Sequence, residues 1–408
     1  MTTAGEQTGP RAALQLIRSR NFGPYFVGNA SSASGTWFQN LAASLLVYRL
    51  THSAFLLGVL NFCNFVPVLL LAPWAGSAAD RFDRKRLLLV TQVGSTVLAA
   101  TLAVLAWNEL AEVWVVIVFA AALGIGSAFS APASQALIND LVPRSQLGSA
   151  VALNSMTYNL ARAIGPALAA VCVSTLGIPA SFLVNAGSYL VLVVGLLIVR
   201  PASRPRAGRG EARLRESILL VREQPRLLTY LLIVMAVGFA SDPVNTLAPA
   251  FASAFGHPDT WAGFIIGAFG FGAVCAAFLI AGRVSGSRRR MMITLSMLSL
   301  GMIAFSLSPW LWLGFPLLVV AGFGYLASNT SATARLQLDV QPHQVGRIMA
   351  LWSVAFLGLR PIASLVDGAI AGAFGVRVAG ICLALPALAG AATIYFLQRV
   401  HRPLTKPA

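Results

Sequence analysis

Long apolar stretches alternate with short polar connections along almost the whole chain. Each stretch is close to the roughly 20 residues that an α-helix needs to cross the hydrocarbon core of a bilayer. The stretches are expected at 22–48, 54–78, 87–107, 113–134, 149–173, 180–199, 227–252, 261–282, 291–308, 312–332, 348–370 and 377–397. The connections between them are too short for a large soluble domain, so the pattern predicts an all-α membrane protein with twelve transmembrane helices.

One connection, residues 200–226, is longer than the others and divides the pattern into two sets of six stretches. Its beginning is rich in Pro, Arg and Gly, which is typical of a flexible linker, and charge pairs over 211–224 indicate a surface helix. The expected organisation is an N-terminal segment (1–21), a six-helix bundle (22–199), the linker (200–226), a second six-helix bundle (227–397) and a tail (398–408). The N-terminal segment has no apolar core of the kind a cleaved signal peptide needs.

Composition and charge placement fit this organisation. The chain is 57% hydrophobic and only 10% charged, with a mean hydropathy of +0.76, which is outside the range of soluble domains. The net charge of +16 alone would suggest a nucleic-acid partner. Apart from Arg49, Arg162, Arg360 and Arg377, however, every Lys and Arg lies on one side of the predicted membrane. This distribution predicts that both termini are cytoplasmic, and it accounts for the basicity without nucleic acid.

Motifs for other kinds of chemistry are missing from the sequence. The cysteines Cys63, Cys172, Cys275 and Cys382 lie far apart inside apolar stretches, without the spacing of a metal site or a redox pair. No nucleophile with a base and no phosphate-binding glycine loop is present. We therefore expect neither an enzyme nor an ATP-driven pump, and no metal or cofactor.

Two related segments point to an internal repeat. Residues 139–148 align with residues 338–346, and the same register places Leu153 with Leu351 and Arg162 with Arg360. A repeat of this kind predicts two bundles of similar fold and the same orientation in the membrane.

The connection after the second stretch, Gly76-Ser-Ala-Ala-Asp80-Arg81-Phe-Asp83-Arg84-Lys85-Arg86, mixes acidic and basic residues. A simple basic loop would satisfy the positive-inside rule without Asp80 or Asp83. Gly76, Asp80, Arg81 and Arg84 match the Gly-x-x-x-Asp-Arg-x-x-Arg-Lys/Arg signature between helices 2 and 3 of the major facilitator superfamily. With the repeat, the chain resembles that superfamily over nearly its whole length. For residues 76–86 alone, the alternative interpretation is an ordinary stop-transfer loop.

Further segments narrow the resemblance. Residues 45–58, Pro67 and residues 159–167 are similar to the bacterial exporter branch that includes enterobactin exporters and macrolide-efflux-type proteins. The resemblance implies a monomer in the bacterial inner membrane that exports a drug, natural product or siderophore by proton antiport with alternating access. The alternatives are proton-coupled import and lipid flipping or scrambling. The chain also departs from the antiporter motif of drug exporters, because Ala161 and Ala169 stand where that motif has glycines.

The resemblance also implies a gating role for Gly76, Asp80, Arg81 and Arg84, as a latch for the outward-facing state. Gly76 is expected to allow close backbone approach. Asp80 is expected to interact with the start of the eleventh helix, near Gly346 and Arg347.

Charged side chains inside the apolar stretches are candidates for proton coupling, because charges in hydrocarbon are costly unless they are paired or hydrated. Arg162 and Arg360 fall near the middle of the fifth and eleventh stretches, Asp242 lies deep in the seventh, and Asp367 follows Arg360. A transported proton needs a carboxyl group that titrates near neutral pH. We expect Asp242 to carry the proton, with Asp367 as the second candidate and with Arg162 or Arg360 adjusting the pKa of the carboxyl group. The alternative is that these charged residues form purely structural ion pairs.

Polar and aromatic residues at helical spacing predict a substrate cavity. Asn29, Ser32, Thr36 and Asn40 share one face of the first helix, and Asn154, Tyr158 and Arg162 share one face of the fifth. The predicted lining is Asn29, Thr36, Trp37, Asn40, Asn61, Asn64, Asn154, Tyr158, Asn245, Phe264, Phe271 and Trp352. Such a surface suits a bulky amphipathic molecule, although small polar residues in membrane helices also serve simply as packing contacts.

Overall fold

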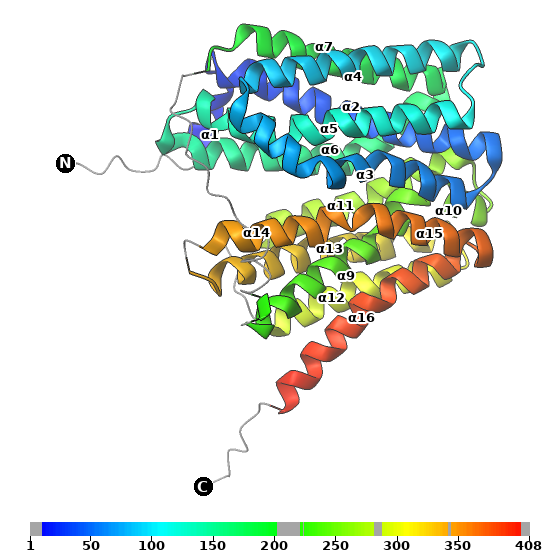
Figure 1. Cartoon of the computed structure of the whole chain (residues 1–408). Coiled ribbons are helices and arrows are strands. Elements are labelled where there is room, and N and C mark those ends of the chain that lie inside the picture. The colour runs from blue at the N-terminus through cyan, green and yellow to red at the C-terminus, as the bar shows by residue number, and fades with distance from the viewer. Residues whose placement is uncertain (1–9, 202–220, 223, 281–287, 342–343, 401–408) are drawn as a thin grey trace.

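The computed structural model describes residues 10–201, 221–222, 224–280, 288–341 and 344–400. Two helical bundles lie one above the other in Figure 1. The first contains α1 (Pro10–Ile17), α2 (Phe22–Thr51), α3 (Ala54–Arg81), α4 (Arg84–Trp107), α5 (Val113–Leu141), η1 (Arg144–Gln146), α6 (Leu147–Leu176) and α7 (Ile178–Ile198). The surface helix expected over 211–224 falls mostly outside the described residues.

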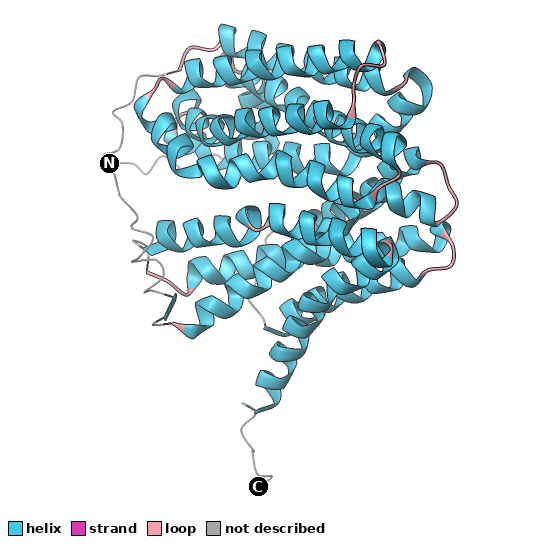
Figure 2. Cartoon of the chain, turned by 45° about the vertical axis from the view of Figure 1, so that its right-hand side comes forward, coloured by secondary structure: helices cyan, strands magenta, loops and turns pink. Residues whose placement is uncertain are grey.

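The second bundle repeats the plan of the first. It contains α9 (Pro225–Thr246), α10 (Ala248–Ala254), η2 (Asp259–Trp261), α11 (Ala262–Ile280), α12 (Arg288–Leu307), α13 (Leu311–Leu338), α14 (Val345–Ser353), η4 (Val354–Gly358), α15 (Arg360–Phe374) and α16 (Val376–Val400). Figure 2 shows helix throughout both bundles, and no strand occurs in the part of the chain that is described. The predicted all-α fold with two helical bundles is confirmed.

Eleven helical segments among the described residues are long and apolar enough to cross a membrane. The remaining long helix, α2, has 30 residues but is less apolar. Its polar residues include Asn29, Thr36 and Asn40, which the sequence placed on the cavity side. The helix is therefore long enough to span a bilayer, and its lower hydropathy comes from the face it turns inward.

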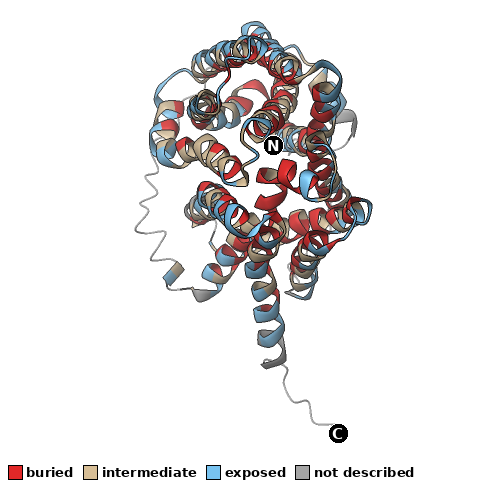
Figure 3. Cartoon of the chain, turned by 90° about the vertical axis from the view of Figure 1, so that its right-hand side faces the viewer, coloured by how far each residue is buried: buried red, intermediate tan, exposed pale blue. Residues whose placement is uncertain are grey.

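The outer surface is apolar, as lipid contact requires. Figure 3 shows buried positions mainly on the inner faces of the helices and exposed positions on the outside. Val90, Val97 and Val104 follow one another at seven-residue spacing on α4, and all three are exposed. Exposed tryptophans, among them Trp107 and Trp312, lie at helix ends, where their amphipathic rings suit the membrane interface.

The two bundles touch mainly through two helix pairs, α3 with α15 and α6 with α11. Glycines permit these contacts. A Cβ atom on Gly58 would lie 2.8 Å from the Cα of Gly368 and would clash with the carbonyl oxygen of Ser364. A Cβ atom on Gly270 would lie 2.5 Å from the Cα of Ala163. At both crossings the backbones therefore meet without intervening side chains.

The bundles are closed at one end and spread apart at the other. Gly58 lies near the beginning of α3, at the end of the molecule opposite the termini, which we call the loop end. Toward the end that holds the termini, which we call the terminal end, the helices of the two bundles diverge (Figures 1 and 2). The chain is therefore in a conformation that is sealed at the loop end.

Two segments expected as continuous helices are interrupted. The segment over 227–252 breaks at Leu247, between α9 and α10, where Pro249 follows within the first turn of α10. The segment over 348–370 passes through the π-helical η4 just before Arg360 and Pro361. Proline and π-helical turns both disturb the regular hydrogen bonds of an α-helix. Both interruptions lie close to charged residues that the sequence singled out.

Arg49 and Asp259 join the bundles across the loop end. The Arg49 side chain donates from Nε to Oδ2 at 2.6 Å and from Nη2 to Oδ1 at 3.0 Å. Arg49 remains 44% exposed, so water weakens the attraction. A double-mutant cycle with Arg49→Ala and Asp259→Ala is expected to give a coupling free energy of about 0.2–1 kcal/mol in denaturant unfolding, falling with added salt. A coupling several times larger and insensitive to salt would contradict this view of the pair.

Candidate functional site

A cavity of about 390 Å³ lies between the two bundles. Most of its wall comes from the first bundle, and the second contributes Asn245, Pro249, Ile266 and Arg360. The wall also includes Leu88 on α4 and Gln135 on α5, both near the terminal end of their helices. The size is within the range of small-molecule sites.

Most of the residues that the sequence assigned to a cavity lie in this wall. They are Asn29, Thr36, Trp37, Asn40, Asn61, Asn64, Asn154, Tyr158 and Asn245. The spacing of three and four along α2 places its amides and hydroxyls on one face, and the tertiary fold turns that face inward. The lining is thus a mixture of amides, hydroxyls and apolar side chains.

Hydrogen bonds hold several of these amides in place. Asn29 Nδ2 donates to Asn154 Oδ1 at 2.6 Å, which ties α2 to α6. Asn61 Nδ2 donates to the carbonyl oxygen of Leu57 at 3.2 Å, and Asn245 Nδ2 donates to that of Ser241 at 2.7 Å. Asn245 Oδ1 is buried without a partner among the described residues, so this amide keeps an unused acceptor beside the cavity.

Three predicted lining residues lie elsewhere. Phe264 and Phe271 are exposed on α11 and do not line the cavity. They lie about 100° around the helix from Gly263 and Gly270, which pack against α6. Trp352 stacks on Phe356 with ring centroids 5.1 Å apart and is not part of the cavity wall. For these aromatic residues the expected position is wrong, since helix packing and not residue type decided which way they face.

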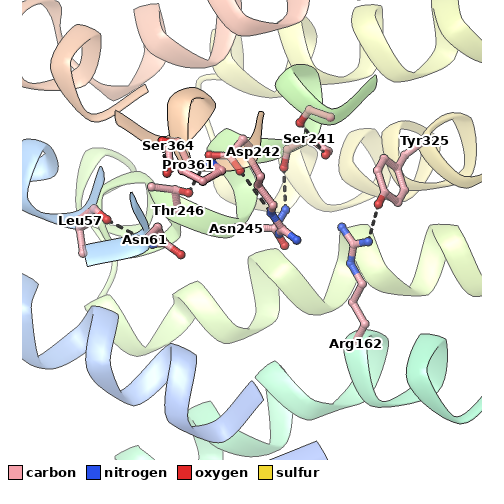
Figure 4. A network of polar contacts seen from close by, with 12 residues as sticks. Leu57, Asn61, Arg162, Ser241, Asp242, Asn245, Thr246, Tyr325, Pro361 and Ser364 are labelled. Atoms are coloured by element: carbon pink, nitrogen blue, oxygen red, sulfur yellow. Dashed lines mark hydrogen bonds and ion pairs between the residues drawn. The ribbon is translucent and has the colours of Figure 1, made fainter. Parts of the chain in front are cut away.

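Asp242 and Arg360 form an ion pair at the edge of the cavity. Asp242 is 2% exposed, and its Oδ1 lies 3.6 Å from Nε of Arg360. Thr246, one turn further along α9, donates from Oγ1 to the other carboxylate oxygen at 2.9 Å, and Figure 4 shows these two side chains next to each other. The Arg360 guanidinium also stacks 4.5 Å from the ring centre of Phe65 on α3. A single arginine thus contacts both bundles.

Arg162 has a different partner. It is 9% exposed, and its Nη1 donates to the Tyr325 hydroxyl at 2.6 Å (Figure 4). Its guanidinium lies 4.5 Å from the centre of the Tyr325 ring and 5.9 Å from that of Phe269. The sequence left open whether Arg162 or Arg360 accompanies Asp242, and in this conformation it is Arg360. The Thr246 contact was readable from its spacing to Asp242, whereas Tyr325 and Phe65 gave no signal in the sequence.

Asp367 is the most deeply buried of the candidate charged residues. Its side chain is 0% exposed, and neither carboxyl oxygen has a hydrogen-bond partner among the described residues. Ser364, on the same face of α15, donates instead to the carbonyl oxygen of Pro361. No group of three or more His, Cys, Asp or Glu side chains comes together in the described ranges, so Asp367 does not belong to a cluster suited to a metal.

The expected gating residues lie at the terminal end, mostly within a helix. Gly76, Asp80 and Arg81 belong to the last turns of α3, and the side chains of Asp80 and Arg81 are exposed. No atom lies within 4 Å of a Cβ placed on Gly76 in this conformation, in which the bundles are apart, so the close approach stays a prediction for the state closed at the terminal end. The expected contact of Asp80 near Gly346 and Arg347 lies outside the described side chains.

Asp83 and Arg84, which belong to the same connection, make hydrogen bonds within the first bundle. Asp83 caps α4 by accepting a hydrogen bond from the backbone nitrogen of Arg86 at 2.7 Å. Arg84 donates to Asp140 on α5 at 2.8 Å. The connection is therefore fixed to its own bundle by Arg84.

Solved structures with the same arrangement of helices include a bacterial homologue of the human lysosomal transporter Spinster, with a TM-score of 0.74 and 15% identity over 96% of this chain and 98% of that chain. A D-xylose–proton symporter has a TM-score of 0.71 and 13% identity over 93% and 97% of the two chains. At these identities the likeness concerns the fold.

Curated relatives include the staphyloferrin A transporter of Staphylococcus aureus, 37% identical over 39% of this chain and 41% of that protein. A second relative, an MFS-type transporter of Bacillus subtilis, is 27% identical over 63% of this chain and 62% of its own length. The first two relatives are therefore matched over less than two thirds of their length.

More distant relatives are matched almost completely. Macrolide efflux protein A of Streptococcus pyogenes is 23% identical over 86% of this chain and 89% of that protein. The family model described as transmembrane secretion effector covers residues 12–403. Together with the two-bundle fold, this match shows that the chain belongs to the transmembrane secretion effector family of the major facilitator superfamily, a family of multi-pass membrane transporters and not of enzymes.

Proposed function

We propose that this transporter exports an amphipathic small molecule from a bacterial cell in exchange for protons, with both termini in the cytoplasm. The observation that carries the proposal is the Asp242–Arg360 ion pair, which is buried at the wall of the cavity. Relatives named as macrolide efflux protein and multidrug efflux pump support the direction of transport. The concentration of basic residues at the terminal end supports the orientation.

The ion pair supplies a physical basis for coupling. In a medium of low dielectric constant the attraction between Asp242 and Arg360 is strong, and a proton on Asp242 removes most of it. Arg360, which already stacks on Phe65 of the first bundle and lines the cavity, then loses its counter-ion and is free to move. Because Asp242 and Arg360 sit beside the helix interruptions at Leu247 and η4, a change in this pair acts where the helices bend most easily.

The cavity lining favours a bulky substrate with both apolar and hydrogen-bonding groups. Trp37 and Tyr158 offer aromatic surface, and Asn61, Asn64 and Asn245 offer amides. Apart from Arg360, the described wall contains no charged side chain. A sugar or a small inorganic ion needs a denser polar surface than this, so a drug, natural product or siderophore is the class of substrate we propose.

The gating role of the terminal-end residues is part of the proposal. When the terminal end closes, Gly76, Asp80 and Arg81 are brought toward the second bundle, where Asp80 is suited to a helix N-terminus. Arg84 already holds the connection against α5 through Asp140, so closure moves the first bundle as a unit. The transporter is expected to work as a monomer surrounded by membrane lipid.

Replacing Asp242 with asparagine tests the proposal. In proteoliposomes, Asp242→Asn is expected to lose transport driven by a pH gradient, because asparagine cannot exchange a proton. Counterflow of substrate without a gradient is expected to remain, since the cavity wall is intact. The measurement compares both modes in wild type, Asp242→Asn and the surface control Glu109→Gln. Full gradient-driven transport by Asp242→Asn would show that another group carries the proton.

A further inference from the structure

We propose that Asp367 is a second proton site, located between the loop end and Asp242, and that it holds a proton in the conformation described here. The inference rests on the proposed proton antiport. It extends that mechanism from one carboxyl group to a relay of two.

The surroundings of Asp367 favour the neutral form of its carboxyl group. The side chain is 0% exposed and neither oxygen has a hydrogen-bond partner in the described part of the chain. An ionised carboxylate at such a place loses its hydration without compensation, which costs far more than burying a neutral carboxylic acid. Asp242, in contrast, has Arg360 and Thr246 as partners. Of the two carboxyl groups, Asp367 is therefore the one that holds the proton.

No cation among the described side chains of the neighbouring helices pairs with Asp367. The helices packed against α15 are α3, α9 and α16. Their described titratable and charged side chains, with Arg360 on α15 itself, are Cys63, Asp80, Arg81, Arg226, Tyr230, Asp242, Arg377, Cys382 and Tyr395. Arg360 is engaged by Asp242. Asp242 therefore keeps the negative charge beside its counter-ion, and Asp367 keeps the proton.

The position of Asp367 along α15 gives the relay a direction. Asp367 follows Arg360 by seven residues, which is two helical turns or about 10 Å toward the loop end. Its neighbour Gly368 packs against Gly58 of α3, and this contact belongs to the seal between the bundles. When the seal opens, Asp367 is reached from the loop end before Asp242. When it is closed, as here, the way out leads past Asp242 and Arg360 to the cavity.

The transfer itself is a simple proton exchange. The O–H bond of Asp367 breaks as one forms on a carboxylate oxygen of Asp242, directly or through water. The negative charge moves to Asp367, and Arg360 loses its ionised partner. Release of the proton from Asp242 to water in the cavity then restores the ion pair, and Asp367 stays ionised until it takes up a new proton from the loop end when the seal opens. The described conformation corresponds to the state before transfer, with the first carboxyl group loaded.

Infrared spectroscopy of the full-length protein in lipid tests the protonation directly. At neutral pH we expect a carbonyl stretching band from a protonated carboxyl group in wild type and in the control Glu109→Gln. The band is expected to vanish in Asp367→Asn. A band that persists unchanged in Asp367→Asn, or a wild type without any such band, would overturn the proposal. This readout does not depend on transport.

Transport assays test the relay. Asp367→Asn is expected to keep substrate counterflow, which also shows that it folds, and to lose both gradient-driven transport and substrate-driven proton movement. Asp367→Glu, which keeps a titratable group, is expected to recover part of both. If Asp367→Asn showed gradient-driven transport and substrate-driven proton movement at the wild-type level, the relay would be overturned. A wild type that ignores the pH gradient would overturn the proposed antiport and the relay with it, while the infrared band would still report the proton on Asp367.

Discussion

Arg360→Met is expected to lower the free energy of unfolding by up to about 3 kcal/mol, because it leaves Asp242 buried without a counter-ion. Breaking a buried ion pair costs about 3–5 kcal/mol when one charge remains. The lower end applies here, since Arg360 keeps 22% of its side chain exposed and the ion-pair distance is 3.6 Å. Thermal or denaturant unfolding of the purified protein in detergent measures the loss.

The double mutant Asp242→Asn/Arg360→Met separates charge from packing. With both charges removed, the free energy of unfolding is expected to return close to that of wild type, because no uncompensated carboxylate remains. The methionine side chain fills part of the space of the arginine next to Phe65. If the double mutant were as unstable as Arg360→Met alone, the loss would have to come from the contact with Phe65 and not from the ion pair.

Gly58→Leu is expected to shift the transporter away from the conformation sealed at the loop end. The substituted side chain would collide with Ser364 and Gly368 on α15. Overpacking of this kind costs about 1–3 kcal/mol, which corresponds to a change of about five- to 150-fold in the ratio of sealed to open molecules. Distances between spin labels at Glu109 on the first bundle and Phe374 on the second are expected to lengthen.

Gly94→Leu provides the matched control for this experiment. Gly94 lies on α4, and no atom comes within 4 Å of a Cβ placed on it. The same change of residue is therefore expected to leave the label distances unchanged. Equal distances in Gly58→Leu and wild type would mean that the contact between α3 and α15 does not determine how the loop end closes.

The fold was largely predictable because it follows from local patterns. The apolar stretches found in the sequence are helical where they are described, with interruptions at Leu247 and at η4. The helical spacing of Asn29, Thr36 and Asn40 correctly grouped them on one face of α2. The repeat placed Arg162 and Arg360 at equivalent points of α6 and of the interrupted segment formed by α14, η4 and α15. What failed was the length of the helices at the terminal end, where α3 continues through Arg81 and turns the expected loop residues into helix.

The partners within the site could not be read from the sequence. Arg162 and Arg360 occupy equivalent positions, yet one contacts Tyr325 and the other Asp242. Phe264 looked like a cavity residue by type, but the glycine face of α11 is the one that packs against α6. These outcomes depend on how helices far apart in the chain are rotated against each other.

The sequence by itself determined that this chain is a membrane protein of two bundles, because apolar length, charge placement and an internal repeat can all be read along the chain without knowing which helices touch. The resemblance of its motifs to the major facilitator superfamily added the prediction of a transporter. Only the tertiary structure decided that Asp242 is paired while Asp367 is buried without a partner. The state of a carboxyl group depends on the charges and dipoles that surround it, and in this protein those are supplied by helices that are distant in sequence and meet only when the two bundles are packed.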